Sequence, residues 1–341
     1  MTRNYMAAIA GVIMASAMTV IQADVSLFGH IDTSIDATDQ DGGSDDVNFN
    51  CTTCSVGFKG KEDLGNGLAA IFKLDFQYDT VNAEDPGIKD RDQWLGMAGN
   101  FGQVRVGTIS TLYKSHGAKL DPLYRTALEG RGRGLQSNLH RGAGEEGEGR
   151  ADNTLRYDTP SWNGLKAGFH YTLDSSEDDD EDDNPYGVGL SYENGGILVF
   201  ADYITNDTGG DDSAWKVGGK YTLNNLALTA QYEKDKGLIS SKTPDTTGDG
   251  ADLWQLGASY TLGNNMLYFG YGNSSSGSDD STAADYFAWT IAGVHHMSKR
   301  TSVYAGFSEV DCDDPDDDVC SKVGDEGGED DKFSIGMKHK F

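Results

Sequence analysis

The sequence predicts an all-β protein, an antiparallel up-and-down β-barrel of about 16 strands that spans a membrane. Three observations lead to this fold class. Apolar and polar residues alternate with a period of two, and very short turns alternate with long polar loops. Beyond the N-terminal segment, no apolar run approaches the roughly 20 residues that a membrane-spanning helix needs. The chain is therefore expected to cross a membrane with strands or to be a soluble β protein.

The first 23 residues have the layout of a secretory signal peptide. Arg3 precedes an apolar run that extends to about Ile21, and a small residue ends the segment. We place the cleavage site before Asp24, although Ile21 departs from the small residue usual three positions before a cut. A single-pass anchor is the alternative, and the lack of a basic cluster directly after the run argues against it. The mature chain, 24–341, then forms one exported domain.

Alternation is clearest at residues 226–235, "LALTAQYEKD". One face carries Leu226, Leu228, Ala230 and Tyr232, and the other carries Thr229, Gln231 and Glu233, as in a β-strand. Residues 215–223 and 253–262 repeat the pattern. In a soluble sandwich the apolar face would form the core, so alternation alone does not separate a sandwich from a membrane barrel.

The lengths of the connections do separate these two folds. Short links at 193–196, 224–225, 263–265 and 298–300 alternate with longer acidic or Ser/Gly-rich links around 37–47, 80–89, 110–150, 174–184, 205–212, 236–250, 274–283 and 310–330. Short turns on one side and long loops on the other are typical of outer-membrane barrels, and about eight long loops imply about 16 strands. Aromatic residues near the strand ends suit the girdles of such a barrel.

Four cysteines, Cys51, Cys54, Cys312 and Cys320, fit an oxidising compartment. In an extended strand the Cα atoms of Cys51 and Cys54 would lie about 10 Å apart, too far for a disulfide, so a bond between them requires a turn and a strand that begins only near Cys54. Cys312 and Cys320 lie in one acidic loop and can close a short ring. Zinc or redox chemistry at the Cys-x-x-Cys motif is the alternative, although no neighbouring His or second such motif completes a metal site. The pairing stays open.

The sequence holds no catalytic constellation. Its seven histidines are scattered and no nucleophile motif accompanies them, so an outer-membrane barrel enzyme is a disfavoured alternative. A secreted calcium-binding adhesin would need periodic Gly/Asp repeats, which are absent. We expect no enzyme activity, no resident cofactor or metal, and no nucleic-acid partner.

Several segments, which cover both ends and the middle of the mature chain, carry a specific resemblance. They are "DVSLFGHIDTSI" at 24–35, "SVGFKGKEDLGNGLAAIFKLDFQYD" at 55–79, "GNFGQVRVG" at 99–107, "RADNTLRYDTPSWNGLKAGFHY" at 150–171, "SKRTSVYAGFS" at 298–308 and the C-terminal "FSIGMKHKF". In these segments the chain resembles the Gram-negative general diffusion porin family. The resemblance implies a homotrimer of 16-stranded barrels in the outer membrane, surrounded by lipid and lipopolysaccharide.

The resemblance also implies how the channel works and assembles. Each barrel would enclose a water-filled pore for passive diffusion of small hydrophilic solutes and ions, narrowed by an inward-folded third long loop. The C-terminal Phe341, with Phe333 in the alternating pattern before it, would be an insertion signal read by the barrel-assembly machinery.

The third long loop, 110–150, is basic in its first part, although the chain has a formal net charge of -28. The candidate residues of the constriction in this loop are Lys114, Lys119, Arg125, Glu129, Arg131, Arg133 and Arg141. If this loop lines the constriction, its cations lie where low-dielectric walls focus the field and would attract small anions. The alternative is that several of them face solvent or pair with carboxylates of the barrel.

Alternation turns further charged side chains of the strands inward. These candidate wall residues are Lys59, Lys73, Arg105 and Arg156, with Asp32 and Asp75 as acidic counterparts. A transverse field across the pore is therefore expected. In the family's common pattern the inward loop is acidic and the opposite wall basic, so the basic loop leaves the ion preference open. A channel selective for phosphate or another small anion is the alternative function.

The remaining long loops are strongly acidic, at 175–184, 311–320 and 325–331. The simplest interpretation is that they are solvated external loops. The alternative is that they bind divalent cations such as calcium or magnesium, which could bridge to lipopolysaccharide phosphates.

Overall fold

The computed structural model describes residues 24–40, 46–81, 88–140, 149–173, 184–205, 213–236, 238, 252–275, 286–312 and 330–341. The predicted signal peptide lies outside these residues. The strands are β1 (Asp24–Gln40), β2 (Asp46–Cys51), β3 (Ser55–Gly65), β4 (Leu68–Gln77), β5 (Lys89–Gly99), β6 (Gly102–Ser110), β7 (Arg150–Asp158), β8 (Leu165–Thr172), β9 (Tyr186–Asn194), β10 (Ile197–Thr205), β11 (Ser213–Leu223), β12 (Leu226–Lys236), β13 (Asp252–Leu262), β14 (Asn265–Ser275), β15 (Tyr286–His296), β16 (Thr301–Cys312) and β17 (Asp330–Lys340). Three short helices, α1 (Leu112–Gly117), η1 (Gly130–Gly132) and η2 (Asn138–His140), lie between β6 and β7. None of the helices in the described ranges has the length and apolar character needed to cross a membrane.

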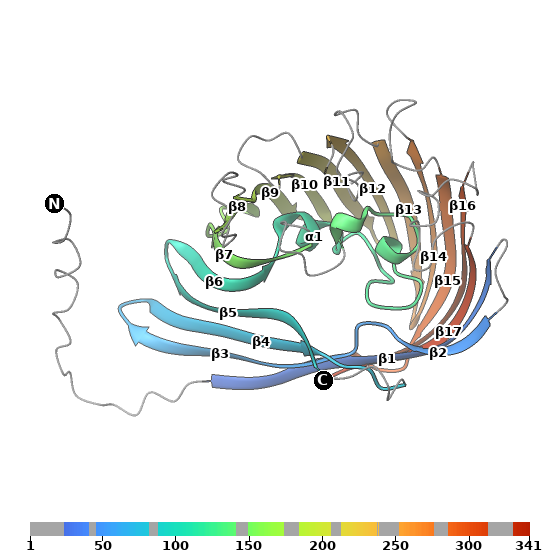
Figure 1. The fold of residues 1–341 in the computed structure, drawn as a ribbon, viewed down its shortest axis with the longest axis horizontal. Helices are drawn as coiled ribbons and strands as arrows, with labels where there is room; N and C mark the ends of the chain where they lie inside the picture. The colour runs from blue at the N-terminus through green and yellow to red at the C-terminus, as the bar shows by residue number, and fades with distance from the viewer. Residues whose placement is uncertain are drawn as a thin grey trace, which may run out of the picture.

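The strands form one closed antiparallel barrel (Figure 1). Consecutive strands pair with each other, except β2 with β3, and β1 pairs with β17 to close the ring. β1 also pairs with β3 along its first half and with β2 along its second half. Segments β2 and β3 therefore act as one barrel strand that is interrupted at residues 52–54. The barrel has 16 strands, and the predicted fold class is confirmed.

The apolar face of the strands points outward. In β12, Leu226 and Leu228 are 37% and 47% exposed, whereas Gln231 and Glu233 are 3% and 0% exposed. A water-soluble protein would bury the leucines and expose the polar side chains, so this arrangement requires apolar surroundings. The orientation excludes the soluble sandwich that the alternation alone left open.

The connections follow the predicted division into short turns and long loops. Two-residue turns join β3 to β4, β9 to β10, β11 to β12 and β13 to β14. Such turns need backbone in the left-handed region, which asparagine and glycine adopt at least cost. Asn66 and Asn224 both have φ of 54°, and Gly195 has φ of 60°.

The last residue completes the seam of the barrel. The Phe341 N–H donates to the Gly29 carbonyl at 3.1 Å, and the Gly29 N–H donates to the Phe341 carbonyl at 3.1 Å. The phenyl ring lies over Gly29, where a Cβ would stand 2.6 Å from the ring. Glycine at this position therefore makes room for the terminal phenylalanine.

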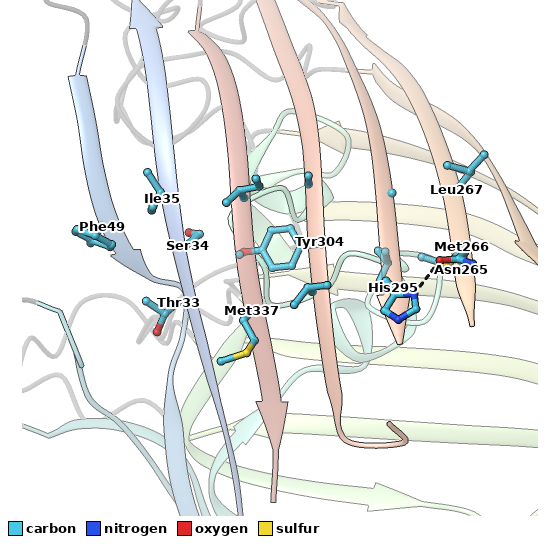
Figure 2. Close-up of a pocket in the computed structure, with 16 residues that line it drawn as sticks. Thr33, Ser34, Ile35, Phe49, Asn265, Met266, Leu267, His295, Tyr304 and Met337 are labelled. Atoms are coloured by element: carbon cyan, nitrogen blue, oxygen red, sulfur yellow. Dashed lines mark hydrogen bonds between the residues drawn. The ribbon is translucent and has the colours of Figure 1, made fainter. Parts of the chain in front are cut away.

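A shallow hollow of about 630 Å³ lies on the outer face across β14–β17 and β1 (Figure 2). Gly293 and Ala305 leave space there, and the flanking Ile35, Leu267 and Met337 are exposed apolar residues. The hollow belongs to the outward apolar band and is separate from the polar inner face of the strands.

Candidate pore constriction

The longest described connection, segment 111–140, joins β6 to β7 and contacts the inner, polar face of the barrel. Figure 1 draws α1 within the ring of strands. The Tyr113 hydroxyl reaches Glu233 of β12, and Arg133 reaches Ser308 of β16. Near the middle of the segment, Lys338 of β17 donates to the Tyr124 carbonyl. The segment is thus held by strands that lie far from β6 and β7 in sequence.

The segment begins with a capped helical turn. Thr111 has extended backbone and its hydroxyl accepts from the Lys114 N–H at 3.2 Å, which is the usual N-cap arrangement. The Ser115 hydroxyl donates to the Thr111 carbonyl at 2.6 Å. This turn directs Tyr113 and His116 toward β10–β12.

Glu233 is the main anchor for both ends of the segment. Its carboxylate is fully buried and accepts from the Tyr113 hydroxyl at 2.8 Å, the Ser137 hydroxyl at 2.6 Å and the Ser137 N–H at 3.3 Å. Gln231 also donates to it at 2.6 Å. A buried charge is stable only when its acceptor capacity is filled, and here the donors come mostly from segment 111–140.

A second buried anchor surrounds Lys216. Its ammonium donates to the Tyr113 carbonyl and to His140 Nε2, the latter at 2.8 Å, and lies 4.0 Å from the centre of the Tyr113 ring. Burial and the nearby Lys216 charge hold the pKa of His140 well below its usual range, so the imidazole is neutral and its Nε2 accepts the hydrogen bond from Lys216. His116 Nδ1 contacts Asp202 at 2.7 Å. In the sequence these anchors have no signal beyond the position of Glu233, Lys216 and Asp202 on the polar faces of their strands.

The middle of the segment is held by its own carboxylates. Glu129 accepts from Arg131 Nε at 2.7 Å and from the Arg125 N–H at 2.8 Å. Asp121 accepts from the Gly130 N–H at 2.8 Å and from the Leu123 N–H at 2.8 Å. Burial raises the pKa of Asp121 to about 6, despite these hydrogen bonds.

The predicted basic residues of this loop fall into two groups in the structure, buried side chains and exposed or half-buried ones. Lys114, Arg131 and Arg133 are buried, and Arg133 donates to the Ser308 hydroxyl at 2.8 Å. Lys119 pairs with Glu193 at 2.8 Å in an exposed ion pair. Lys119 thus meets a carboxylate of β9, whereas Arg131 meets Glu129 within the loop itself. The structure says nothing of Arg141, which falls outside the described residues.

Arg125 differs from its neighbours. Its Nη1 donates to His30 Nδ1 at 3.0 Å, and within the described residues no carboxylate oxygen lies within 4.0 Å of its guanidinium. Two buried nitrogen atoms, Arg125 Nε and His30 Nε2, have no hydrogen-bond partner in the described part of the chain. The side chain is half-buried at the inner face of β1, so its charge is neither neutralised nor fully solvated.

The predicted inward residues of β3–β7, together with Arg91, Arg150, Asp92 and Asp158, form a charged surface that we call the basic wall. Lys73 contacts Asp92 at 2.7 Å and Asp75 at 3.4 Å, while Arg105 and Arg156 share Asp158. Its members are Lys59, Lys73, Arg91, Arg105, Arg150 and Arg156, with the carboxylates Asp75, Asp92 and Asp158. Lys59 is exposed and lies 5.5 Å from the centre of the Phe28 ring.

Part of the basic wall could not be predicted from the alternation of residues, for a structural reason. The pairing of β4 with β5 shifts between Leu74 and Phe76, so strict alternation fails opposite Asp75. There Arg91 donates to Asp75 at 3.3 Å and is buried. A bulge of this kind leaves no clear mark in a single sequence.

The acidic candidate Asp32 is buried at the inner face of β1, where it accepts from the Tyr304 hydroxyl at 2.9 Å. Nearby, a disulfide joins Cys51 to Cys54 with a Cα–Cα distance of 5.9 Å. As required for such a bond, residues 52–53 form a turn and β3 begins only at Ser55. Cys320 and the side chain of Cys312 lie outside the described residues, so their pairing stays a prediction.

Comparison with known proteins identifies the family. The sequence profile of the Gram-negative porins matches residues 5–315. The chain belongs to the Gram-negative porin family. It is 25% identical to major outer membrane protein P.IB of Neisseria meningitidis over 360 residues, which cover 96% of this chain and 97% of the relative. It is 29% identical to outer membrane porin protein 32 of Delftia acidovorans over 324 residues, which cover 87% and 86%.

Solved structures agree on the fold of this porin. An anion-selective porin from Comamonas acidovorans superimposes with a TM-score of 0.76 at 23% identity, covering 94% of this chain and 100% of the other. Salmonella typhi OmpF, solved in complex with daunomycin, gives a TM-score of 0.73 at 19% identity, covering 93% and 97%. With the outward apolar face, these relationships make the protein a channel of the Gram-negative outer membrane.

Proposed function

We propose that this porin favours small anions among the hydrophilic solutes and ions that diffuse through it, and that it performs no catalysis. The observation that carries the proposal is the guanidinium of Arg125, which faces into the barrel near the basic wall and has no carboxylate partner among the described residues. Segment 111–140 would be the inward loop that narrows the channel. Its many contacts with the inner face of β12, β16 and β17 support this role.

The balance of charge supports a preference for anions. The basic wall holds six cations and three carboxylates, so its described side chains carry a surplus of positive charge. In a narrow channel with low-dielectric walls, such a surplus raises the local concentration of anions.

The overall charge acts in the opposite direction. The formal net charge of -28 is concentrated in acidic loops, which would attract cations to the mouth. Charges that face bulk water are screened within about 8–10 Å at physiological ionic strength. We therefore expect the charges at the narrowest part of the pore to decide selectivity. The anion-selective Comamonas porin, with a TM-score of 0.76, is consistent with this function.

The test is the reversal potential of single channels in planar bilayers across a potassium chloride gradient. We expect a reversal potential on the anion-selective side, and Arg125→Gln should move it toward zero or beyond. Lys119→Gln is the matched control, because it removes an exposed charge that is already paired with Glu193. A cation-selective wild-type channel, or equal shifts in both variants, would contradict the proposal.

We propose that this porin has the same oligomeric state as its relatives. OmpT of Vibrio cholerae, solved in a trimer form, shares the fold with a TM-score of 0.68, and we propose a homotrimer here as well. Sedimentation in detergent would test this. Surrounding lipid and lipopolysaccharide, divalent cations at the acidic loops, and recognition of Phe341 and Phe333 by the barrel-assembly machinery are part of the same proposal. The acidic loops lie almost entirely outside the described residues.

A further inference from the structure

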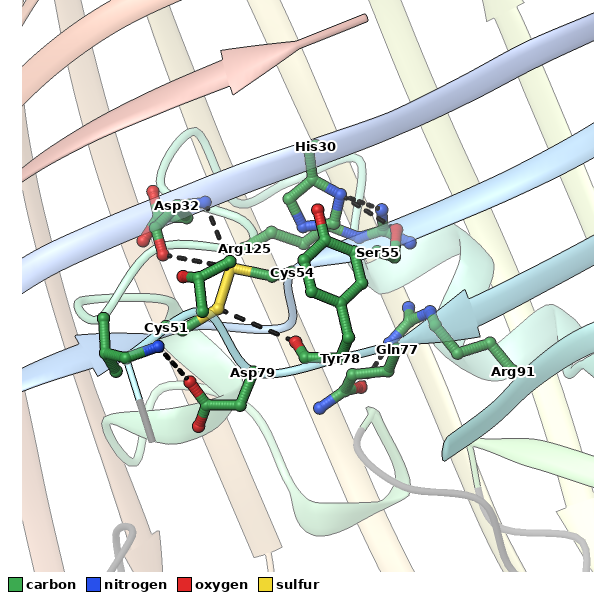
Figure 3. Close-up of a disulfide and its surroundings, with 12 residues drawn as sticks. His30, Asp32, Cys51, Cys54, Ser55, Gln77, Tyr78, Asp79, Arg91 and Arg125 are labelled. Atoms are coloured by element: carbon green, nitrogen blue, oxygen red, sulfur yellow. Dashed lines mark hydrogen bonds between the residues drawn. A yellow bond between two sulfur atoms is a disulfide. The ribbon is translucent and has the colours of Figure 1, made fainter. Parts of the chain in front are cut away.

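We propose that the Cys51–Cys54 disulfide is a positioning element for the selectivity of the channel, because it holds the side chains that place Arg125. The inference rests on the anion preference proposed above. The structural basis is a short series of contacts from the disulfide through Ser55 and His30 to the Arg125 guanidinium (Figure 3).

The disulfide lies where the barrel wall is interrupted. Thr33 pairs with Cys51 and His30 pairs with Ser55, so two residues of β1 face three residues between β2 and β3. The extra residue forces a turn, in which Thr53 adopts a φ of 49°. An interruption of this kind disrupts the ladder locally, and the pairing of β3 with β1 and β4 starts at Ser55, directly after the turn.

The cross-link compensates for the missing ladder contacts. Cys54 is fully buried, and its sulfur accepts from the Asp32 N–H at 3.4 Å. The Cys51 sulfur lies 3.7 Å from the Tyr78 carbonyl oxygen, next to the end of β4. The disulfide therefore ties the start of β3 to both neighbouring strands.

Ser55 follows Cys54 directly, and its hydroxyl links the position of the disulfide to His30 and Arg125 at the inner face. Its hydroxyl lies 3.1 Å from His30 Nδ1, which also receives Arg125 Nη1 at 3.0 Å. A guanidinium can only donate, so Nδ1 is the acceptor and the imidazole carries its proton on Nε2. The acceptor is a neutral imidazole, so this hydrogen bond holds Arg125 in place without an ion pair that would neutralise its positive charge.

The position of the Arg125 guanidinium depends on this contact with His30. Its backbone is in the left-handed region, with a φ of 62°, and its long side chain has many rotamers in water. The contact with His30 fixes the charge at the inner face of β1. If the disulfide opens, Ser55 can move and the Arg125 guanidinium is no longer held at His30. The pairing of β1 with β3 at residues 56–61 remains.

The experiment uses full-length porin carrying Cys312→Ser and Cys320→Ser, so that Cys51 and Cys54 are its only cysteines. Reversal potentials are recorded in a potassium chloride gradient before and after dithiothreitol, and mass spectrometry after alkylation verifies that the bond has opened. Cys51→Ser with Cys54→Ser gives a permanently open form if the reductant fails to reach the buried bond. Thermal unfolding shows that each barrel is intact.

We expect the open forms to lose at least about half of the difference in reversal potential between the parent and Arg125→Gln, because a mobile charge focuses the field less well. Ser55→Ala, which keeps the disulfide, should shift the potential in the same direction. An unchanged potential in the open forms or in Ser55→Ala, with Arg125→Gln shifted, would overturn the inference alone. An unchanged potential in Arg125→Gln would overturn the proposed anion preference and this inference together.

Discussion

Replacing Glu233 with glutamine should loosen segment 111–140 from the barrel wall. The carboxylate is fully buried and accepts from the Tyr113 hydroxyl at 2.8 Å and from Ser137 at 2.6 Å and 3.3 Å. Glutamine keeps the shape of the side chain but offers one acceptor oxygen and no charge. Some donors of Tyr113 and Ser137 then remain buried without an acceptor.

The size of the effect follows from these contacts. Hydrogen bonds to a charged group contribute about 1.5–3 kcal/mol each, and the amide oxygen of glutamine keeps part of that. We expect a loss of about 3 kcal/mol in the free energy that holds the segment to β12, which raises the detached population about 100-fold. The barrel itself should persist, because its strands keep their own hydrogen-bond ladders.

Amide hydrogen exchange, followed by mass spectrometry, measures this directly. Exchange across α1 and residues 135–140 should accelerate in Glu233→Gln, whereas exchange in β11–β13 should not. Glu193→Gln is the matched control: Glu193 also binds this segment, through Lys119, but the two side chains are 64% and 43% exposed. An exposed pair contributes at most about 1 kcal/mol, so the control should change little. Equal effects of both substitutions, or none in Glu233→Gln, would refute the reasoning.

Three further predictions concern pH, packing and the outer face. Burial raises the pKa of Asp121 to about 6, so lowering the pH from about 7 to about 5 neutralises a carboxylate of segment 111–140; reversal potentials should become more anion-selective, and Asp121→Asn should abolish this step. Gly306→Ala places a Cβ 2.7 Å from Leu128 and should cost about 1–3 kcal/mol in unfolding experiments, whereas Gly293→Ala, with no atom closer than 3.8 Å, should be neutral. Leu256→Arg puts a charge on the outer face and should reduce stability in lipid vesicles by about 2–4 kcal/mol, measured by urea unfolding; an unchanged midpoint would contradict the outward orientation.

The fold could be predicted because its main signals are local. Alternation in "LALTAQYEKD" records which side chains of one strand face lipid, and no distant residue is needed to read it. Turn residues such as Asn66 and Asn224 mark the places where the chain reverses. The reach of an extended strand also predicted that a bond between Cys51 and Cys54 would require a turn, as the structure has it.

The site was predicted less completely, for physical reasons. Arg125 was identified by its charge and its loop, but so were Arg131 and Arg133, which are buried and hydrogen-bonded. Composition shows how many cations a loop holds, but not which of them find partners. Likewise, the bulge opposite Asp75 turned Arg91 inward against the count by alternation.

By itself, the sequence determined the barrel, the faces of its strands and its resemblance to porins, because these depend on patterns within about ten neighbouring residues. Only the tertiary structure decided which charges meet in the pore. Tyr113 and Glu233 are separated by 120 positions, and His30 and Arg125 by 95. Closure of the barrel brings such residues within hydrogen-bond distance, and burial then fixes which of them keep a free charge.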